Sequence, residues 1–252
     1  MFTRAITRLP GADFADGLTT VDLGRPDYAT ICRQHQAYCR TLGDLGLTVE
    51  TLPALDGYPD AYFVEDPAII TEQVAIVTRP GAMSRRGEAQ AIASAVAQHR
   101  PVARIEPPGT LEGGDVLIVG KQVYVGLSAR TNRAGIEQLA DILAPQGFDV
   151  TGVPVEAGLH LKSSVSLVAP NTLLVGPPLA KADAWNGLRR LLVPPDEDYA
   201  ANALWINNHI LMAKGFPATR EQLDGLGLPI IEMEVSEARK MDGGLSCMSL
   251  RF

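Results

Sequence analysis

Long apolar runs are absent from this sequence. No stretch reaches the roughly 20 apolar residues that a membrane-spanning helix requires, and the first ten residues lack the apolar core of a signal peptide. With 46% hydrophobic and 20% charged residues, the composition is that of an ordinary globular protein. We therefore expect a soluble cytoplasmic protein whose 252 residues form one or two domains.

Cysteine is scarce, and histidine is too. The three cysteines are an odd number and lack the spacing of a disulfide framework. Cysteine and histidine nowhere cluster at the spacing of a zinc site, so no metal is expected. Cys32 and Cys39 lie seven positions apart in a segment with helical periodicity, where packing roles are expected.

Basic residues are fewer than acidic ones, with 22 Lys and Arg against 29 Asp and Glu, and no stretch forms a basic patch. Nucleic-acid binding depends on neutralising phosphates with basic side chains, so a nucleic-acid partner is not expected. A net charge of −7 instead favours a cationic small molecule as the substrate.

The segment 240–252 holds the most informative cysteine. The glycine pair at 243–244 lets the backbone turn sharply or approach a ligand closely, and Cys247 follows it. Apolar and polar residues then alternate over 248–252, as in a strand with one buried face. This places Cys247 where a loop meets a strand, which suits a nucleophile. A small buried core residue is the alternative.

The hydrophobic periodicity predicts an alternation of strands and helices along the whole chain. Strands are predicted at 2–8, 47–52, 61–70 with a break at 65–67, 73–78, 116–119, 122–126, 165–169, 172–176, 201–206, 209–213 and 248–252. Helices are predicted at 27–45, 85–99, 132–146, near 181–191 and near 219–225.

Polar breaks recur in this order at steps of about 40 to 48 residues, a period typical of repeat architectures. The aligned breaks are Asp66, Glu112, His160, Asn207 and Cys247. Five units of strand, hairpin, helix and strand can close into a ring, with the C-terminal strand pairing beside the N-terminal one. The ring would bring the polar breaks together at a central channel of a single α/β domain, residues 1–252.

The residues at these breaks would suit attack by sulfur on a planar cation. Cys247 needs a base, and His160 can accept and later donate a proton. Glu112 can orient the imidazole. The further acids Asp66 and Glu65 leave more negative charge than a triad needs, which favours a guanidinium because its N–H groups pair with carboxylates.

Residues of opposite charge could bind the other end of an amino-acid substrate. Arg85 and Arg130 could hold an α-carboxylate, and Asp60 could hold an α-ammonium group. Leu18 stands in a loop rich in Gly and Asp that could act as a lid. Alternatives remain for several sites: His160 as a core histidine, Arg130 as a solvated linker residue, and Glu112 with Asp115 as turn builders.

Six segments of the sequence resemble the dimethylarginine dimethylaminohydrolases, a family of the guanidine-modifying superfamily with the pentein fold. They lie at 63–68, 78–86, 111–117, 125–132, 158–163 and 242–247. The resemblance implies five ββαβ modules around a pseudo-fivefold axis, an α/β propeller. It also implies a nucleophile at Cys247, a general acid/base at His160 and the acid of the triad at Glu112. Substrate-binding positions are implied at Leu18, Asp60, Glu65, Asp66, Arg85, Arg130 and Met241.

The implied reaction is hydrolysis of N-omega-methylated arginines to citrulline and methylamine or dimethylamine, through a thiouronium intermediate on the cysteine. No cofactor or metal is implied. An arginine deiminase acting on unmethylated arginine and a catalytically silent binding protein of the same fold remain the alternatives. A homodimer is kept open as the assembly.

Overall fold

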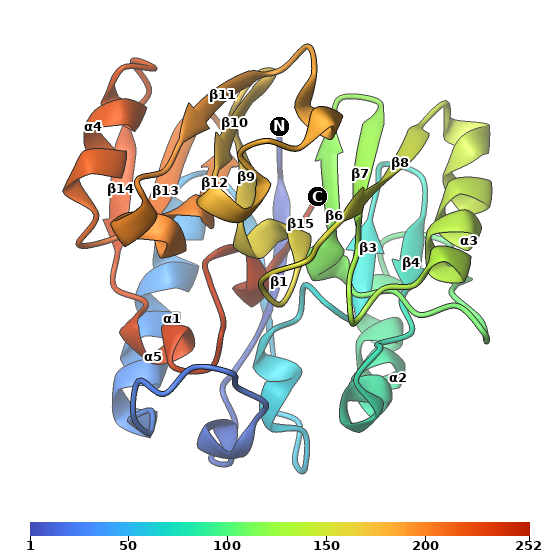
Figure 1. The fold of residues 1–252 in the computed structure, drawn as a ribbon. Coiled ribbons are helices and arrows are strands. Elements are labelled where there is room, and N and C mark those ends of the chain that lie inside the picture. The colour runs from blue at the N-terminus through green and yellow to red at the C-terminus, as the bar shows by residue number, and fades with distance from the viewer.

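The strands of the chain form five separate three-stranded sheets in the computed structural model, which describes residues 1–252 (Figure 1). In each sheet an antiparallel pair is extended by a third strand that runs parallel to the middle one. A parallel third strand needs a crossover, and helices supply it in four of the five modules.

Four modules follow one another along the chain. The first contains β3 (Ala68–Ile70), β4 (Ala75–Val77), α2 (Arg86–Val96) and β5 (Val102–Arg104). The second contains β6 (Val116–Val119), β7 (Gln122–Leu127), α3 (Arg133–Leu143) and β8 (Asp149–Pro154). The third contains β9 (Val165–Ala169), β10 (Thr172–Val175) and β11 (Arg189–Leu192). The fourth contains β12 (Leu204–Ile206), β13 (His209–Ala213), α4 (Pro217–Asp224) and β14 (Ile230–Met233), and α5 (Ser236–Arg239) follows it.

The fifth module is assembled from both ends of the chain. It contains β15 (Leu250–Arg251), β1 (Arg4–Arg8), α1 (Tyr28–Asp44) and β2 (Thr48–Leu52). β1 pairs antiparallel with β15, Ile6 facing Leu250, and parallel with β2. The predicted closure of a fifth unit by the C-terminal strand is confirmed.

Each pair of neighbouring modules shares a hydrophobic core, so the five sheets form a closed ring. Ile69 packs with Val116 between the first two modules, and Leu117 packs with Leu173 between the second and third. A cluster of 28 buried residues joins the third, fourth and fifth modules. A smaller one, containing Ala68 and Leu250, joins the fifth module back to the first.

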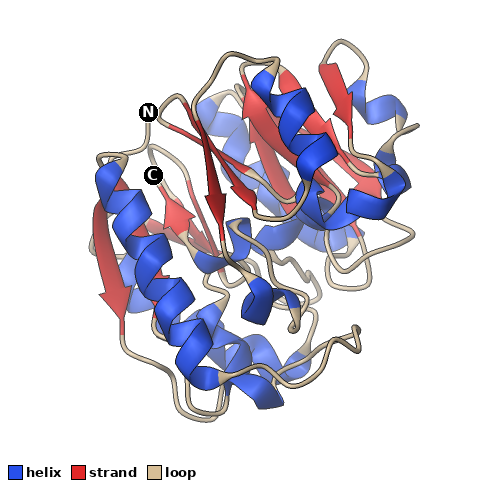
Figure 2. Cartoon of the chain, turned by 90° about the vertical axis from the view of Figure 1, so that its left-hand side faces the viewer, coloured by secondary structure: helices blue, strands red, loops and turns tan.

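Two of the five α-helices, α1 and α3, begin at a polar side-chain cap. The side chain of Asp27 accepts a hydrogen bond from the backbone of Thr30 at the start of α1, and Asn132 accepts one from Gly135 at the start of α3. The helices lie on the outer side of the sheets, with α1 in the foreground of Figure 2. None of them is long and apolar enough to span a bilayer.

Two predicted elements are wrong. Residues 61–64 are not a strand: a 3-10 turn spans Pro59–Tyr62, and β3 begins only at Ala68. The carbonyls of Asp60 and Phe63 accept from the buried guanidinium of Arg85 instead of a neighbouring strand. The helix predicted near 181–191 is replaced by one 3-10 turn, Asp183–Trp185, and by β11.

The polar break assigned to Asn207 also needs correction. Asn207 lies in the turn between β12 and β13 with a φ of 46°, and its side chain donates to the carbonyls of Phe2 and Leu45. The residue in the equivalent place before β12 is Asn202, whose side chain bonds to Ser246. Asn202, and not Asn207, is therefore the polar break of this module.

Candidate active site

Loops from several modules line one pocket. Eight of the ten site residues predicted from the sequence line it: Leu18, Asp60, Asp66, Arg85, Arg130, His160, Met241 and Cys247. The remaining two, Glu112 and Glu65, lie behind this lining. Four further residues line the pocket: Gly243, which belongs to the glycine pair noted in the sequence, and Phe63, Leu159 and Asp242, which were not among the predicted site residues.

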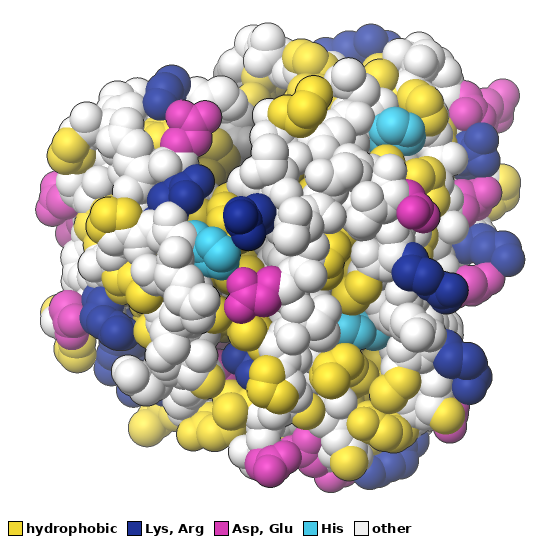
Figure 3. All heavy atoms as spheres, turned by 180° about the vertical axis from the view of Figure 1, so that it is seen from behind, with side chains coloured by type: hydrophobic (Ala, Val, Ile, Leu, Met, Phe, Trp, Pro, Cys, Tyr) yellow, Lys and Arg dark blue, Asp and Glu magenta, His cyan; other side chains and the backbone are white.

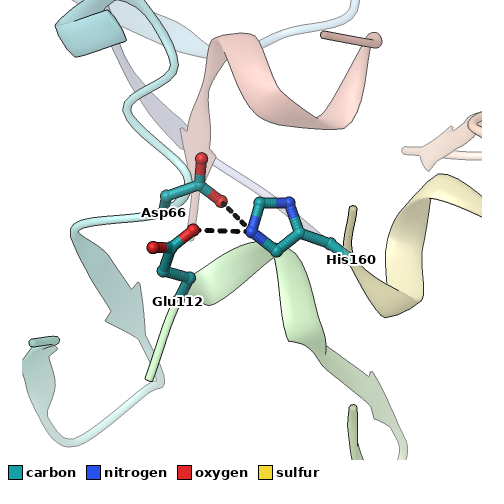
Figure 4. A group of neighbouring side chains, drawn as sticks. All are labelled: Asp66, Glu112 and His160. Atoms are coloured by element: carbon teal, nitrogen blue, oxygen red, sulfur yellow. Dashed lines mark hydrogen bonds and ion pairs between the residues drawn. The ribbon is translucent and has the colours of Figure 1, made fainter. Parts of the chain in front are cut away.

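His160 and Glu112 form a buried hydrogen-bonded pair. Nε2 of His160 lies 2.6 Å from Oε2 of Glu112 and 3.9 Å from Oδ1 of Asp66, and the three side chains face one another in Figure 4. Glu112 is fully buried, and its other oxygen accepts from the backbone of Ala82 at 3.3 Å. Because the carboxylate is fixed in this way, it also fixes the orientation of the imidazole.

Acidic neighbours keep His160 charged. Burial by itself lowers the pKa of an imidazole, but Asp66, the hydrogen-bonded Glu112 and Asp115 stabilise the cation and raise the pKa of His160 to about 9. Asp115 also accepts from the backbone N–H of Leu161, the residue after His160. Asp115 thus supports the histidine, a role that the sequence did not separate from turn building.

Cys247 faces the pocket while its neighbours pack inward. Met248 and Leu245 belong to the core, whereas Cys247 is only half-buried and its sulfur accepts from the backbone N–H of Gly244 at 3.4 Å. Burial raises the pKa of the Cys247 thiol, and the charges of Glu65 and Asp66 add to this, to about 12. The thiol is therefore neutral in the pocket as it stands.

Asp66 is held as an anion at the floor of the site. Its Oδ2 accepts from Nη1 of Arg85 at 2.5 Å, and Oδ1 accepts from the backbone of Gly114 at 3.0 Å. Burial raises the pKa of this carboxyl, but His160 and Arg85 outweigh burial and keep the pKa below its usual value. A negative charge therefore persists next to the sulfur.

The guanidinium of Arg85 is largely occupied within the protein. Besides Asp66, it donates to both oxygens of Glu88 at 2.9 and 2.8 Å and to two backbone carbonyls. Arg130 is less engaged, since its Nη1 lies 3.6 Å from Glu112 in a side chain that is 17% exposed. Of the two arginines, Arg130 has the freer donors for a substrate carboxylate.

The loop around Leu18 lies closed against the pocket. The backbone N–H of Leu18 donates to both oxygens of Asp60, at 3.0 and 3.2 Å. Two residues on, the backbone of Thr20 donates to Asp242 at 2.5 Å. A Cβ on Gly17 would lie 2.5 Å from Oδ1 of Asp60, so glycine permits this close contact.

Glu65 lies outside the pocket lining. Its carboxylate accepts from Nζ of Lys162 and Oγ of Ser246, each at 2.6 Å, and from Arg251 at 3.3 Å. The expected direct contact with the substrate is therefore not supported by the position of this side chain.

One group of side chains has the composition of a metal site. Ligand atoms of Asp66, Glu112 and His160 lie within 4.8 Å of one another. The acids are already engaged, however, Asp66 by Arg85 and Glu112 by His160. The charges of the three side chains are therefore balanced within the protein, and the short contact between His160 and Glu112 suits proton transfer by His160.

Known proteins of similar sequence carry two names. A family model described as arginine deiminase matches residues 47–182. An N(G),N(G)-dimethylarginine dimethylaminohydrolase of Pseudomonas aeruginosa is 44% identical over 254 residues, which cover 100% of both chains. A protein of the same name from Streptomyces coelicolor is 39% identical and covers 99% of this chain and 96% of its own.

Solved structures agree with these matches. The dimethylarginine dimethylaminohydrolase of Pseudomonas aeruginosa, in a cysteine-to-serine mutant complexed with citrulline, has a TM-score of 0.98 at 43% identity over 100% of both chains. The N-terminal domain of ArgZ, an arginine dihydrolase from cyanobacteria, has a TM-score of 0.88 at 19% identity, covering 100% of this chain and 97% of its own, which shows a common fold. Full-length similarity in sequence and structure thus shows that this chain belongs to the dimethylarginine dimethylaminohydrolase family and has its five-module pentein fold.

Proposed function

We propose that this protein hydrolyses N-omega-methylated arginines to citrulline and methylamine or dimethylamine. The observation that carries the proposal is a single pocket lined by a thiol, a cationic imidazole backed by a buried carboxylate, and a persistently anionic aspartate. The relatives described above carry the name of this activity.

In the first half-reaction the thiolate of Cys247 attacks the guanidinium carbon and forms a C–S bond. His160 donates its proton to the methylated nitrogen, the C–N bond breaks with its electron pair on nitrogen, and the amine leaves. In the second half-reaction His160 takes a proton from water, whose oxygen attacks the same carbon. The C–S bond then breaks with its electron pair on sulfur, and the hydroxyl proton passes to solvent, which releases citrulline and restores the thiolate.

The substrate itself supplies the charge that activates the sulfur. Within the protein, burial and the anions Glu65 and Asp66 raise the pKa of the Cys247 thiol to about 12. A bound guanidinium brings a positive charge next to the sulfur and lowers this pKa by direct Coulomb attraction. Thiolate therefore forms mainly where a substrate is already held.

Distinct groups would hold the two ends of the substrate. Asp66 is placed to pair with the guanidinium, and Arg130 to bind the α-carboxylate. Asp60 and the backbone of Leu18 form one wall near the amino-acid end, and the side chain of Met241 lies beside Gly17 and Asp60 in that wall. Arg85 supports Asp66 and the backbone of the preceding turn.

Amine release tests this proposal directly. Arginine, monomethylarginine and asymmetric dimethylarginine are supplied in turn without added metal, and ammonia, methylamine, dimethylamine and citrulline are quantified. We expect the highest kcat/KM with a methylated substrate. Greater efficiency with arginine would instead support a deiminase, the activity that names the matching family model.

Cys247→Ser is the matched control and should fold but release no amine. Turnover by this variant would reject Cys247 as the nucleophile. If the unaltered chain turned over none of the three substrates, a binding protein would be indicated.

We further propose that residues 1–252 act as one catalytic domain in the cytoplasm. Shared cores between all neighbouring modules support one domain, and three unpaired cysteines are typical of a reducing compartment. A homodimer is the assembly to be checked, by light scattering of the purified chain.

A further inference from the structure

Four residues form a closed cycle of hydrogen bonds beneath the pocket, three of them between side chains and one to a backbone carbonyl. Glu65 accepts from Lys162 and from Ser246. The amide of Asn202 donates to the hydroxyl of Ser246 at 3.0 Å and to the backbone carbonyl of Lys162 at 2.9 Å. These four residues, which we call the axial ring, come from four different modules, and each stands in the loop that leads into the first strand of its module.

The axial ring holds the turn that carries Cys247. Asn202 accepts from the backbone N–H of Ser246, and the backbone N–H of Glu65 donates to the carbonyl of Cys247 at 3.2 Å. On the other side, Arg251 donates to the carbonyls of Ser246 and Ser249 and also to Glu65. The backbone on both sides of the nucleophile is therefore fixed by buried partners.

The same ring also places charge near the sulfur. Glu65 is 3% exposed, and its anion is balanced by Lys162 and Arg251 rather than by water. None of the four ring residues lines the pocket. They can thus act on Cys247 without touching a bound substrate.

We infer that Glu65 and Lys162 are positioning residues: through Ser246 and Asn202 they hold Cys247 in place, and their opposite charges set how readily its thiol ionises. The inference rests on the proposed role of Cys247 as the nucleophile, and it replaces the direct substrate contact expected for Glu65.

Other charged groups also face Cys247. They are Asp66 from the loop before β3, His160 from the loop before β9, Asp242 from its own loop, and Asp60, Arg85 and Arg130 across the pocket. All six line the substrate pocket, so changing them would alter binding as well. The pair of Glu65 and Lys162 can be altered with this lining intact.

Alkylation of Cys247 by iodoacetamide tests the inference without a substrate. Well below the pKa, the rate is proportional to the fraction of thiolate. Glu65→Gln removes the nearby negative charge and should raise the rate at a fixed pH by about tenfold. Lys162→Met leaves Glu65 with Arg251 as its only paired cation and should lower the rate by about tenfold. Mass spectrometry of the Cys247 peptide separates this reaction from alkylation of Cys32 and Cys39.

Three matched variants separate charge from folding. Lys162→Arg keeps the cation and should restore the rate of the unaltered chain. The double variant Glu65→Gln with Lys162→Met removes both charges of the close buried pair and leaves Arg251 with its backbone and hydroxyl acceptors, so it should fold and react at an intermediate rate. Ser246→Ala opens the ring and should lower kcat, with KM changed by less than about twofold because no substrate contact is lost.

Opposite shifts for the two single variants support the inference. Shifts in the same direction, or none in variants whose melting curves show that they are folded, would overturn it. If Glu65→Gln raised KM without changing the alkylation rate, this would show that Glu65 contacts the substrate directly. Alkylation needs no turnover, so these outcomes can be told apart from a failure of the proposed activity.

Discussion

At the scale of single residues, buried charges account for most of the site. Asp66, Glu112 and Glu65 are each 3% exposed or less, and each is matched by a cation that the fold places beside it. Breaking such a pair leaves an uncompensated buried charge, which is costly. The chemistry of the pocket and its stability therefore depend on the same contacts.

The charge of His160 should make stability depend on pH. Its pKa is raised from 6.5 to about 9 by Asp66 and Glu112, which outweigh burial. The stabilisation is complete below pH 6.5 and is lost as the pH rises through about 9. We expect the urea midpoint of the unaltered chain to fall over this window and that of His160→Gln to stay nearly flat. Parallel curves would show that the imidazole is neutral in the fold.

Arg85 should matter more for stability than for binding. Arg85→Ala removes the cation paired with Glu88 and the nearer of the two paired with Asp66, so we expect a loss of about 3–5 kcal/mol in the free energy of unfolding, measured with urea. Arg130→Ala is the matched control, because Arg130 makes only one long contact at 3.6 Å. It should unfold nearly as the unaltered chain does but show a raised KM. Equal stability of the two variants would contradict this division of roles.

At the scale of elements, the loop at residues 17–20 is held by few contacts of its own. Its attachments are the backbone bonds of Leu18 and Thr20 to acids on either side of the pocket and the hydroxyl of Thr19 on the carbonyl of Lys240. The side chain of Leu18 is 43% exposed, so burial adds little to hold the loop. Small changes under this loop should therefore affect substrate capture.

Gly17→Ala tests this dependence. Its Cβ would lie 2.5 Å from Asp60 and would push the loop away from that carboxylate. We expect KM for the methylated arginine to rise by about tenfold, as after losing one substrate contact, with a smaller change in kcat. Gly43→Ala in α1 is the control, because nothing lies within 4 Å of its Cβ, and it should leave KM unchanged. Similar kinetics for the two variants would show that Asp60 adjusts freely.

The local signals in the sequence predicted some elements better than others. α1 and α3 could be located because Asp27 and Asn132 cap amphipathic segments. The helix predicted at 181–191 was wrong because the apolar residues there follow a helical spacing. In the structure Trp185 is buried in a 3-10 turn, and its indole N–H donates to the carbonyl of Leu179. Burial and hydrogen bonding of Trp185 thus determine the backbone conformation of this segment, and the local pattern of apolar residues does not predict them.

At the scale of the whole molecule, the repeat made the convergence of the site predictable. The recurring polar breaks predicted that Asp66, Glu112, His160 and Cys247 lie close together. The closed ring of five sheets places them there. The axial ring was not predictable, because Asn202 and Lys162 look like ordinary polar loop residues. Their function depends on contacts with residues of other modules.

Closure of the ring through both chain ends predicts that the chain can be permuted. Thr3 donates to the carbonyl of Phe252 at 3.0 Å, so a short glycine linker can join the ends. Opening the chain at the exposed turn after Gly120 cuts only the β6–β7 connection, and we expect this permutant to fold and retain kcat/KM within about tenfold. Opening at Val123, inside buried β7, is the control and should give no folded protein. Loss of folding in both permutants would refute the prediction.

The two-ended fifth module also bears on when the enzyme can become reactive. β15 leaves the ribosome after every other element of the fold, and the turn with Cys247 comes just before it. During translation, Asp66, Glu112 and His160 are therefore synthesised well before Cys247. Chemistry must wait until β15 pairs with β1, so translation products that stop before Cys247 cannot attack a metabolite.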